Sequence, residues 1–230
     1  MTSREVKLAI AVPSPGTSVP TQFFESFAAM QKPYGSVFLT LTDHRYWLQI
    51  DGVRNNFVEQ AFKANCTHIA MLDADQVYPV DTIPRLFAHG KKIVRAKVHR
   101  RGPPFDPILL RADAAGRYQH IPDEEWMNGG LVEVDATGVA CCGLFDMEVF
   151  ENIPYPWFEI DKERRIGEDI VFCRKAIKAG YEIWVDCDLE VQHLIELGAG
   201  RTLYEFYKWK TEAETGNRQV RRKARKAGWR

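Results

Sequence analysis

Two aspartates directly follow a segment with the composition of a buried strand. Residues 67–72 read THIAML, Asp73-Ala74-Asp75 come next, and Pro79 then opens a helical pattern. On an extended chain residues i and i+2 point to the same side, so we expect both carboxylates to face one spot. Paired carboxylates repel each other unless a cation lies between them, and Mn²⁺ or Mg²⁺ prefers such oxygen ligands. The alternative is a solvated acidic turn, because this short pattern also arises by chance.

A second pair of acids, Glu168 and Asp169, begins an amphipathic helix predicted over Glu168–Ala179. Acidic residues in a first turn suit the helix dipole, so capping is the simpler interpretation. A carboxylate held at a helix start can also accept a proton from a hydroxyl group, which is the functional interpretation.

His193 follows the predicted strand Glu182–Val185. A lone histidine is more often a packed or surface residue than a ligand. Imidazole nevertheless suits Mn²⁺ better than Mg²⁺, and a site of two aspartates and one histidine is chemically reasonable.

Several further side chains are candidates for binding. Trp126, Trp157 and Phe158 have the aromatic surface to stack on a sugar ring or an apolar aglycone, or they belong to the core. Arg100 or Arg101 can reach a phosphate, although solvated loop arginines are the simpler interpretation.

Strand-like and helix-like segments alternate along the chain and set where these residues lie. The expected strands are Val6–Val12, Ser36–Thr42, Thr67–Leu72, Lys92–Val98, Ile108–Arg111, Gly130–Val134 and Glu182–Val185. The expected helices run from Pro20 to Pro33, over Asp51–Asn65 with Asp51 as N-cap, over Asp81–Ala88 with Gly90 as its stop, over Glu168–Ala179 with Gly180 after it, and over Thr202–Glu214.

This alternation predicts an α/β fold whose central sheet is mostly parallel and flanked by helices. Ligands of such sheets bind beyond the carboxyl ends of the strands. The aspartates that follow residues 67–72 fall at such an end, and we expect no second domain.

Composition excludes some classes of protein. The 230 residues are 45% hydrophobic and 27% charged, as in an ordinary globular protein. No apolar run approaches the roughly 20 residues of a membrane-spanning helix, and the first ten residues lack a secretory signal. The five cysteines have no CxxC spacing, so we expect buried thiols and a cytoplasmic protein.

The formal net charge of zero conceals a basic end. Residues 218–230 hold seven Lys or Arg and no acid, which leaves 24 basic against 31 acidic residues elsewhere. A nucleic-acid-binding domain would carry its basic surface across the fold, so we expect no nucleic acid partner. We interpret 218–230 as a flexible tail that is solvated or makes weak contact with a membrane surface.

The chain resembles the nucleotide-sugar-dependent glycosyltransferases of the GT-A fold, close to family-2-like members, over about residues 6–195. The likeness rests on segments in the family's order that read DGVRNN at 51–56, HIAMLDADQVYP at 68–79, VACCGLFDMEVFENIPYPWF at 139–158 and GEDIVFCRKAIKAGYEIWVDCDLEVQHL at 167–194. It implies one GT-A, Rossmann-like domain over 1–217, including a C-terminal helix, followed by the tail. It also implies a small-residue strand at the start of the segment 139–158, followed by a hydrophobic helix and an aromatic loop on the acceptor side.

The resemblance further implies a metal-dependent sugar transfer from a nucleoside-diphosphate sugar to a glycan or other hydroxyl acceptor. Asp75 and His193 would bind Mn²⁺ or Mg²⁺, with Asp73 facing the ribose or a metal-bound water. Asp169 would be the base of an inverting enzyme, with Glu168 beside it near the acceptor.

The donor would occupy a pocket built from separate loops. Its expected lining comprises Pro13, Ser14, Asp43, Arg54, Asp73 and Ala74. A mobile loop around Gly198 and Gly200 would close over the diphosphate, with Arg201 reaching it. UDP is the favoured nucleotide because it is the commonest among such enzymes.

Two other functions stay open. A sugar-nucleotide nucleotidyltransferase shares the sheet and the acidic site, but the segment PSPGTSVPT after the first strand lacks the basic residues it usually needs. A non-catalytic binding module that uses the basic tail would leave the acidic motifs unexplained. Retaining enzymes of the GT-A fold also carry an Asp-x-Asp motif and a late histidine, so the stereochemical outcome is open.

Overall fold

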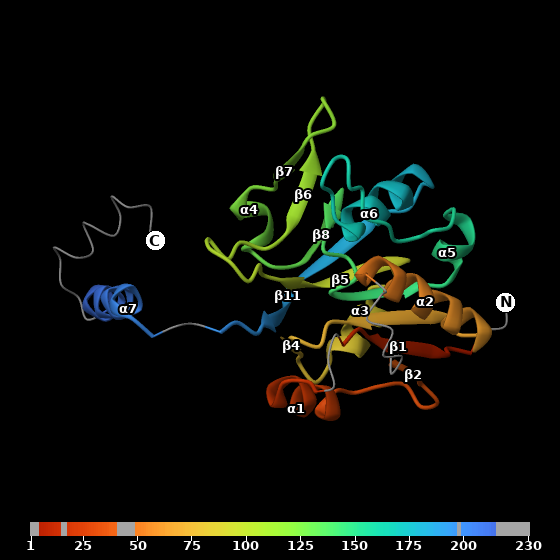
Figure 1. Cartoon of the computed structure of the whole chain (residues 1–230), viewed down its shortest axis with the longest axis horizontal. Coiled ribbons are helices and arrows are strands. Elements are labelled where there is room, and N and C mark those ends of the chain that lie inside the picture. Colours follow the sequence, from red (N-terminus) through yellow and green to blue (C-terminus); the bar gives the residue numbers. More distant parts are fainter. Residues whose placement is uncertain (1–4, 15–17, 41–48, 197–198, 215–230) are drawn as a thin grey trace. The chain divides into compact units, whose positions relative to one another are not determined.

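The computed structural model describes residues 5–14, 18–40, 49–196 and 199–214 (Figure 1). The chain divides into two compact units, Met1–Leu194 and Ile195–Arg230. The first unit carries the sheet, and the described part of the second carries one helix. The boundary predicted between residues 217 and 218 lies outside the described residues and stays a prediction.

The helices and strands follow the expected alternation. In chain order they are β1 (Leu8–Val12), α1 (Thr21–Ala29), β2 (Val37–Thr40), α2 (Ile50–Lys63), β3 (His68–Leu72), β4 (Gln76–Val77), α3 (Thr82–Ala88), β5 (Ile93–Val98), β6 (Leu109–Ala112), β7 (Tyr118–His120), α4 (Asp123–Trp126), β8 (Leu131–Val134), β9 (Ala136–Thr137), β10 (Cys142–Asp146), α5 (Glu148–Asn152), α6 (Glu168–Lys178), β11 (Ile183–His193) and α7 (Arg201–Glu214).

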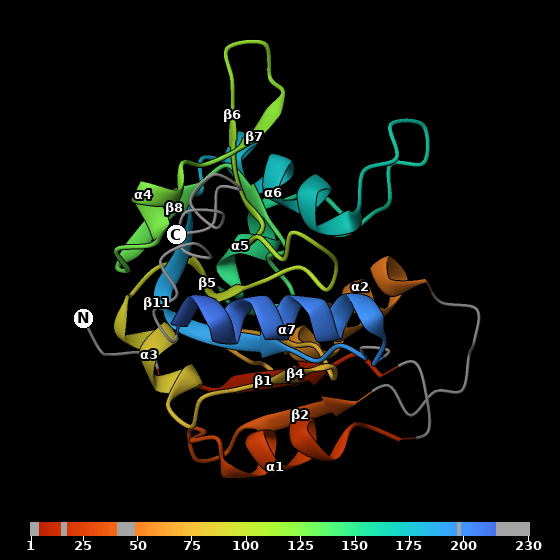
Figure 2. The same ribbon diagram turned by 90° about the vertical axis from the view of Figure 1, so that its left-hand side faces the viewer.

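The large sheet has the order β2-β1-β3-β10-β5-β11-β4, with β8 also paired to β11. Strands β2, β1, β3, β5 and β11 run in one direction, as a mostly parallel sheet requires. Strand β10 lies antiparallel between β3 and β5, so the predicted parallel run is interrupted at its centre. A smaller sheet, β7-β6-β9, carries a hairpin that projects from the first unit in both views (Figures 1 and 2).

Alternate residues of the strands supply two apolar layers, one on each face of the sheet. Leu8 and Ile10 pack in one layer with α1 and α3, whereas Ala9 and Ala11 pack in the other with α2, α5 and α6. This alternation follows from the two-residue period of a strand. In Figure 2 helix α1 lies beside β2 at one end of the sheet.

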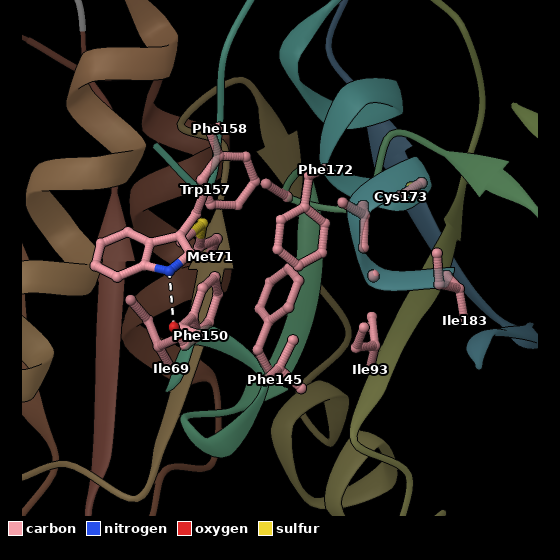
Figure 3. Packing of buried hydrophobic residues seen from close by; sticks show 14 of the residues in the cluster. Ile69, Met71, Ile93, Phe145, Phe150, Trp157, Phe158, Phe172, Cys173 and Ile183 are labelled. Carbon is pink, nitrogen blue, oxygen red and sulfur yellow. Dashed lines mark hydrogen bonds between the residues drawn. The ribbon is translucent and has the colours of Figure 1, made fainter. Parts of the chain in front are cut away.

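Aromatic rings fill the apolar layer on the face of the sheet that packs with α5 and α6 (Figure 3). Phe158 stacks on Phe172 with ring centroids 4.8 Å apart, and both are fully buried. Trp157 is 9% exposed, and its Nε1 donates to the Phe150 carbonyl at 2.8 Å. The expectation that Trp157 and Phe158 stack on an acceptor sugar is therefore corrected, because both rings are already enclosed by the core.

Two local expectations also differ from the structure. Helix α2 begins at Ile50 after Gln49, so Asp51 lies in the first turn instead of capping the helix. Residues 137–143 span the end of β9, a turn and the start of β10, so the strand expected in the segment from residue 139 begins at Cys142. A Cβ on Gly143 would lie 2.0 Å from the Val139 carbonyl oxygen, so only glycine permits this close approach.

Glycines end two helices as expected, because Gly90 and Gly180 adopt φ values of +60° and +87°. Within the described ranges, none of the helices combines the length and the apolar character needed to cross a bilayer.

Candidate functional site

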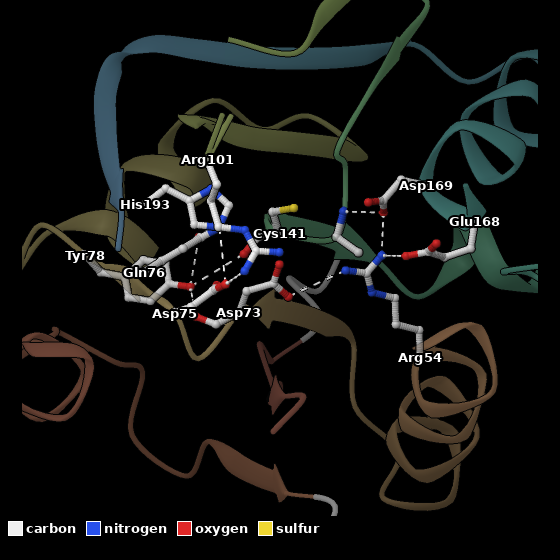
Figure 4. A network of polar contacts seen from close by, with 11 residues as sticks. Arg54, Asp73, Asp75, Gln76, Tyr78, Arg101, Cys141, Glu168, Asp169 and His193 are labelled. Atoms are coloured by element: carbon white, nitrogen blue, oxygen red, sulfur yellow. Dashed lines mark hydrogen bonds and ion pairs between the residues drawn. The ribbon is translucent and has the colours of Figure 1, made fainter. Parts of the chain in front are cut away.

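Asp73 and Asp75 lie in the turn that joins β3 to β4 at the carboxyl end of β3. The Asp73 N–H donates to the Cys141 carbonyl at 2.9 Å, which fixes the turn against the start of β10. Because residues 74 and 75 form a turn, the alternation of an extended chain does not continue through them. The two carboxylates therefore contact different partners, and the expectation that they face one spot stays a prediction (Figure 4).

Asp75 meets His193 through the pairing of β4 with the end of β11. Gln76 pairs with His193 in an antiparallel register, and the Leu194 N–H donates to the Asp75 carbonyl at 2.8 Å. Across this ladder His193 Nε2 lies 3.3 Å from Asp75 Oδ2. The predicted convergence of these two residues is thus present in the fold.

The orientation of the His193 ring is set by its other nitrogen. Nδ1 lies 2.9 Å from the His99 carbonyl oxygen, which only accepts hydrogen bonds. Nδ1 therefore carries a proton, and Nε2 faces Asp75 either as an imidazolium donor or as a lone pair. A lone pair opposite a carboxylate oxygen is stable only with a cation between them. Metal-binding histidines are commonly held in this way.

Arg101 already supplies positive charge at the same oxygen. Its Nη1 lies 3.0 Å from Asp75 Oδ2, and its side chain is 65% exposed. The hydrogen bond from His193 and the charge of Arg101 hold the pKa of Asp75 below its usual value, against the effect of burial. Burial alone would lower the pKa of His193, but its bonds to Asp75 and to the His99 carbonyl raise it.

Arg54 joins Asp73 to the acids of α6 (Figure 4). Its guanidinium lies 3.5 Å from Asp73 Oδ1 and 2.8 Å from Asp169 Oδ1, and it also contacts Glu168. The Arg54 side chain is only 4% exposed. Its charge is shared by three carboxylates, and the expectation that Arg54 lines a nucleotide pocket stays a prediction.

Glu168 and Asp169 do not cap their own helix, although they occupy its first turn. Asp169 Oδ1 accepts from Arg54 and also from the Ala140 N–H at 3.1 Å. Among the residues that the structure describes, none donates a hydrogen bond to Asp169 Oδ2. One oxygen of this carboxylate is therefore held in place while the other is available to a proton donor.

Burial and mutual repulsion act on the acids of this group. Burial raises the pKa of Asp73, and the nearby Asp169 adds to the effect while Arg54 opposes it. Burial also raises the pKa of Glu168, again against Arg54. Burial would lower the pKa of Arg54, but Asp169 and Asp73 together raise it well beyond its usual value. Arg54 is thus a permanent cation that opposes the rise in the pKa of Asp73 and Glu168 caused by burial.

The remaining predicted residues are distributed as follows. Pro13 and Ser14 are half-buried just beyond β1, and Ala74 is 9% exposed in the β3–β4 turn. Trp126 is half-buried, with Lys97 Nζ 5.4 Å from its ring centroid. Arg201 begins α7 in the second unit.

Asp43 lies outside the described residues, as does part of the expected mobile loop, residues 197–198. The Arg201 Nε lies 2.7 Å from Glu205 in the same helix. The roles predicted for Pro13, Ser14, Ala74, Trp126 and Arg201 stay predictions.

The expected metal ligands form a pair and not a group of three. Within the described ranges, no cluster of three or more His, Cys, Asp or Glu side chains is arranged to hold a metal. Asp75 Oδ2 and His193 Nε2 offer one oxygen and one nitrogen donor, 3.3 Å apart. The guanidinium of Arg101 lies against the same Asp75 oxygen, so this oxygen already attracts a cationic group. This donor set fits a divalent ion whose other ligands come from phosphate and water.

Sequence reasoning missed three parts of the site. The His99 carbonyl carries no side-chain signal, so no pattern marks it. The sequence offered both Arg100 and Arg101 as candidates and did not indicate that Arg101 is the one that contacts Asp75. The cysteine next to the turn is also unmarked: burial first, and then the nearby Asp73, raises the pKa of the Cys141 thiol well above its usual value.

Comparison with known proteins finds solved structures of similar fold but does not assign the chain to a family. No family model matches the chain, and no curated protein matches it. The crystal structure of A197 from STIV is 16% identical with a TM-score of 0.53, and the match covers 85% of this chain and 97% of that one. GalNAc-T7, solved with UDP, GalNAc and Mn²⁺, is 11% identical with a TM-score of 0.58 over 84% of this chain.

S. aureus TarS 1–349 in complex with UDP-GlcNAc is 12% identical with a TM-score of 0.50 over 85% of this chain. The match spans 44% of the GalNAc-T7 chain and 60% of the TarS chain. At these identities the likeness concerns the fold. It confirms the expected α/β architecture of GT-A type, a large central sheet flanked by helices.

Proposed function

We propose that this protein transfers a sugar from a nucleoside-diphosphate sugar to a hydroxyl group of an acceptor. One observation carries the proposal: Arg54 connects Asp73, at the end of β3, to Asp169 in α6. Near Asp73 lies the pair of Asp75 and His193, which can attract a cation. The second oxygen of Asp169 has no hydrogen-bond donor among the described residues. A transferase of this kind needs those two functions. It needs positive charge where the diphosphate leaves and a base where the acceptor hydroxyl enters.

The donor side is built from Asp75, His193 and Arg101. We infer that Asp75 and His193 would hold a divalent ion, Mn²⁺ or Mg²⁺, through one oxygen and one nitrogen donor. When bound, such an ion supplies Lewis-acid stabilisation of the charge that grows on the leaving diphosphate. A bound ion would compete with Arg101 for Asp75 Oδ2, and the exposed Arg101 side chain could then contact a phosphate.

The acceptor side is built from Asp169. Arg54 and the Ala140 N–H both bind Oδ1, so the acceptor hydroxyl donates its proton to Oδ2. The acceptor oxygen forms a bond to the anomeric carbon as the bond from that carbon to the diphosphate oxygen breaks. The electron pair leaves with the nucleoside diphosphate, and the proton stays on Asp169. Attack opposite the leaving group makes this an inverting reaction.

UDP is the nucleotide we propose, with Mn²⁺ as the metal. The support comes from two proteins of the same fold, one solved with UDP, GalNAc and Mn²⁺ and the other with UDP-GlcNAc. The acceptor is a glycan or another hydroxyl compound, and Trp126 is the aromatic residue we propose for contact with it.

The test is a panel of UDP-, GDP- and other activated sugars incubated with Mn²⁺ and simple hydroxyl acceptors. We expect release of nucleoside diphosphate and a product of inverted anomeric configuration, read by NMR. Changing Asp169→Asn should leave donor binding unchanged and lower the transfer rate about 100- to 10,000-fold, the range for loss of a general base.

Asp113→Asn is the matched control, because Asp113 bonds Arg117 and Ala115 near the exposed hairpin and should not affect transfer. Release of pyrophosphate from a nucleoside triphosphate and a sugar phosphate would instead identify a nucleotidyltransferase. A retained configuration, or a near-normal rate for Asp169→Asn, would remove Asp169 from the role of base.

A further inference from the structure

Helix α7 carries its four aromatic residues on one broad arc. At 100° per residue that arc spans about 220°, and over residues 201–211 it includes one charged residue, Lys210. The aromatic and aliphatic side chains on it are Leu203, Tyr204, Phe206, Tyr207 and Trp209. Tyr204 is 65% exposed, Tyr207 is 54% exposed and Phe206 is 37% exposed. Neighbouring rings contact each other, with centroids 5.5 Å apart for Phe206 and Tyr207.

The opposite arc of α7 is narrow and charged. It holds Arg201, Glu205 and Lys208, all of them exposed, and Arg201 pairs with Glu205. Large exposed aromatic faces are uncommon on soluble proteins and mark surfaces that bind something. An amphipathic helix with aromatic residues on one side and charges on the other is typical of a segment that lies in a membrane interface.

The charges of the chain are divided between the two units. Residues 195–230 contain ten Lys or Arg and four Asp or Glu, a net charge of +6, whereas residues 1–194 contain 21 and 27, a net charge of −6. An anionic surface therefore attracts the second unit and repels the first. The aromatic face and the basic residues belong to the same unit, so both forces act on the same part of the chain.

We propose that the unit Ile195–Arg230 binds an anionic lipid surface, with the aromatic arc of α7 supplying apolar contact and the positive charge of the unit supplying attraction. Tyrosine and tryptophan prefer the interface of a membrane, and Trp229 adds one more such residue to the basic segment 218–230. Each Lys or Arg near an anionic membrane strengthens binding about fivefold. A basic segment alone would serve a nucleic acid equally well, but the apolar arc with Leu203 and Phe206 favours lipid.

This association is independent of the sugar transfer proposed above. It would place the transferase domain next to a membrane, where a hydroxyl acceptor carried by a lipid or displayed at the surface is concentrated.

The experiment is co-sedimentation of the full chain with vesicles of phosphatidylcholine containing about 30 mol% phosphatidylglycerol, at about 0.1 M salt. We expect binding to these vesicles, at least tenfold weaker binding to pure phosphatidylcholine, and weakening as salt is added. The triple change Arg221→Gln, Arg222→Gln and Lys223→Gln should weaken binding about 100-fold. Phe206→Ser with Tyr207→Ser should weaken it about tenfold.

Tyr34→Ser is the matched control, because Tyr34 is a fully exposed tyrosine of the first unit and its loss should leave vesicle binding unchanged. A chain that ends at residue 217 provides a second test of the basic segment if the triple variant does not fold. Full-length protein that stays in the supernatant would overturn the proposal. So would vesicle binding that survives both changes to the basic segment, or tighter binding to single-stranded RNA than to the anionic vesicles at the same salt.

Discussion

Replacing Arg54 with methionine should destabilise the protein strongly and in a pH-dependent way. Arg54 is 3% exposed and contacts the carboxylates of Asp73, Glu168 and Asp169. Methionine fills a similar volume but leaves three crowded acids without their shared cation. Removal of one partner from a buried ion pair costs about 3–5 kcal/mol, so we expect a loss of that size in the free energy of unfolding at about pH 8.

The pH dependence has a definite sign. Burial already raises the pKa of Asp73 and Glu168, and loss of Arg54 raises both further. A carboxyl group whose pKa is higher in the folded than in the unfolded state binds its proton preferentially in the folded state. The penalty of burying it ionised is therefore present at high pH and is relieved as the pH falls through the raised pKa. The difference between Arg54→Met and the wild type should shrink between about pH 8 and pH 5.

Urea denaturation followed by circular dichroism at several pH values measures this difference. Arg111→Met is the matched control, because Arg111 is 46% exposed and its pair with Glu125 should contribute less than about 1 kcal/mol. A loss below about 1 kcal/mol for Arg54→Met at pH 8, or a loss that grows as the pH falls, would refute the idea that Arg54 neutralises the acids.

Three further predictions test separate parts of the structure. Arg101→Gln should strengthen Mn²⁺ binding about two- to fivefold, measured by electron paramagnetic resonance, because it removes an exposed cation from Asp75; weaker binding would make Arg101 a supporting residue. Trp157→Ala should cost about 3–5 kcal/mol of stability by urea denaturation while the acceptor KM stays unchanged, and a raised KM alone would return this ring to the acceptor site. Removal of residues 218–230 should leave transfer to a water-soluble acceptor intact in a rate assay, and a large loss would place part of the transferase machinery there.

The sequence was sufficient to predict those parts of the site that depend on where strands end. The apolar composition of residues 67–72 marks a buried strand, and ligands of α/β sheets bind beyond such ends. The approach of His193 to Asp75 was expected only from a family resemblance. Its physical basis, the short pairing of β4 with the last residues of β11, has no signal of its own, because β4 contains only two residues.

Other parts depend on contacts between distant elements, which spacing does not determine. Arg54 is one residue on a helix face, and nothing in its neighbours indicates that α6 will bring two carboxylates to it. The antiparallel insertion of β10 is equally hidden, because an apolar strand reads the same in either direction. Burial decides between core and ligand contact for Trp157 and Phe158, and burial is a property of the packed molecule.

The most direct test of the proposed site is a Mn²⁺ titration followed by electron paramagnetic resonance, with and without UDP, on the wild type and on the Asp75→Ala and His193→Ala variants. We predict that the wild type binds Mn²⁺ in a manner strengthened by UDP, and that each variant loses this binding. Wild-type protein that leaves the Mn²⁺ signal unchanged in the presence of UDP, or variants that bind it as the wild type does, would contradict a donor site at Asp75 and His193.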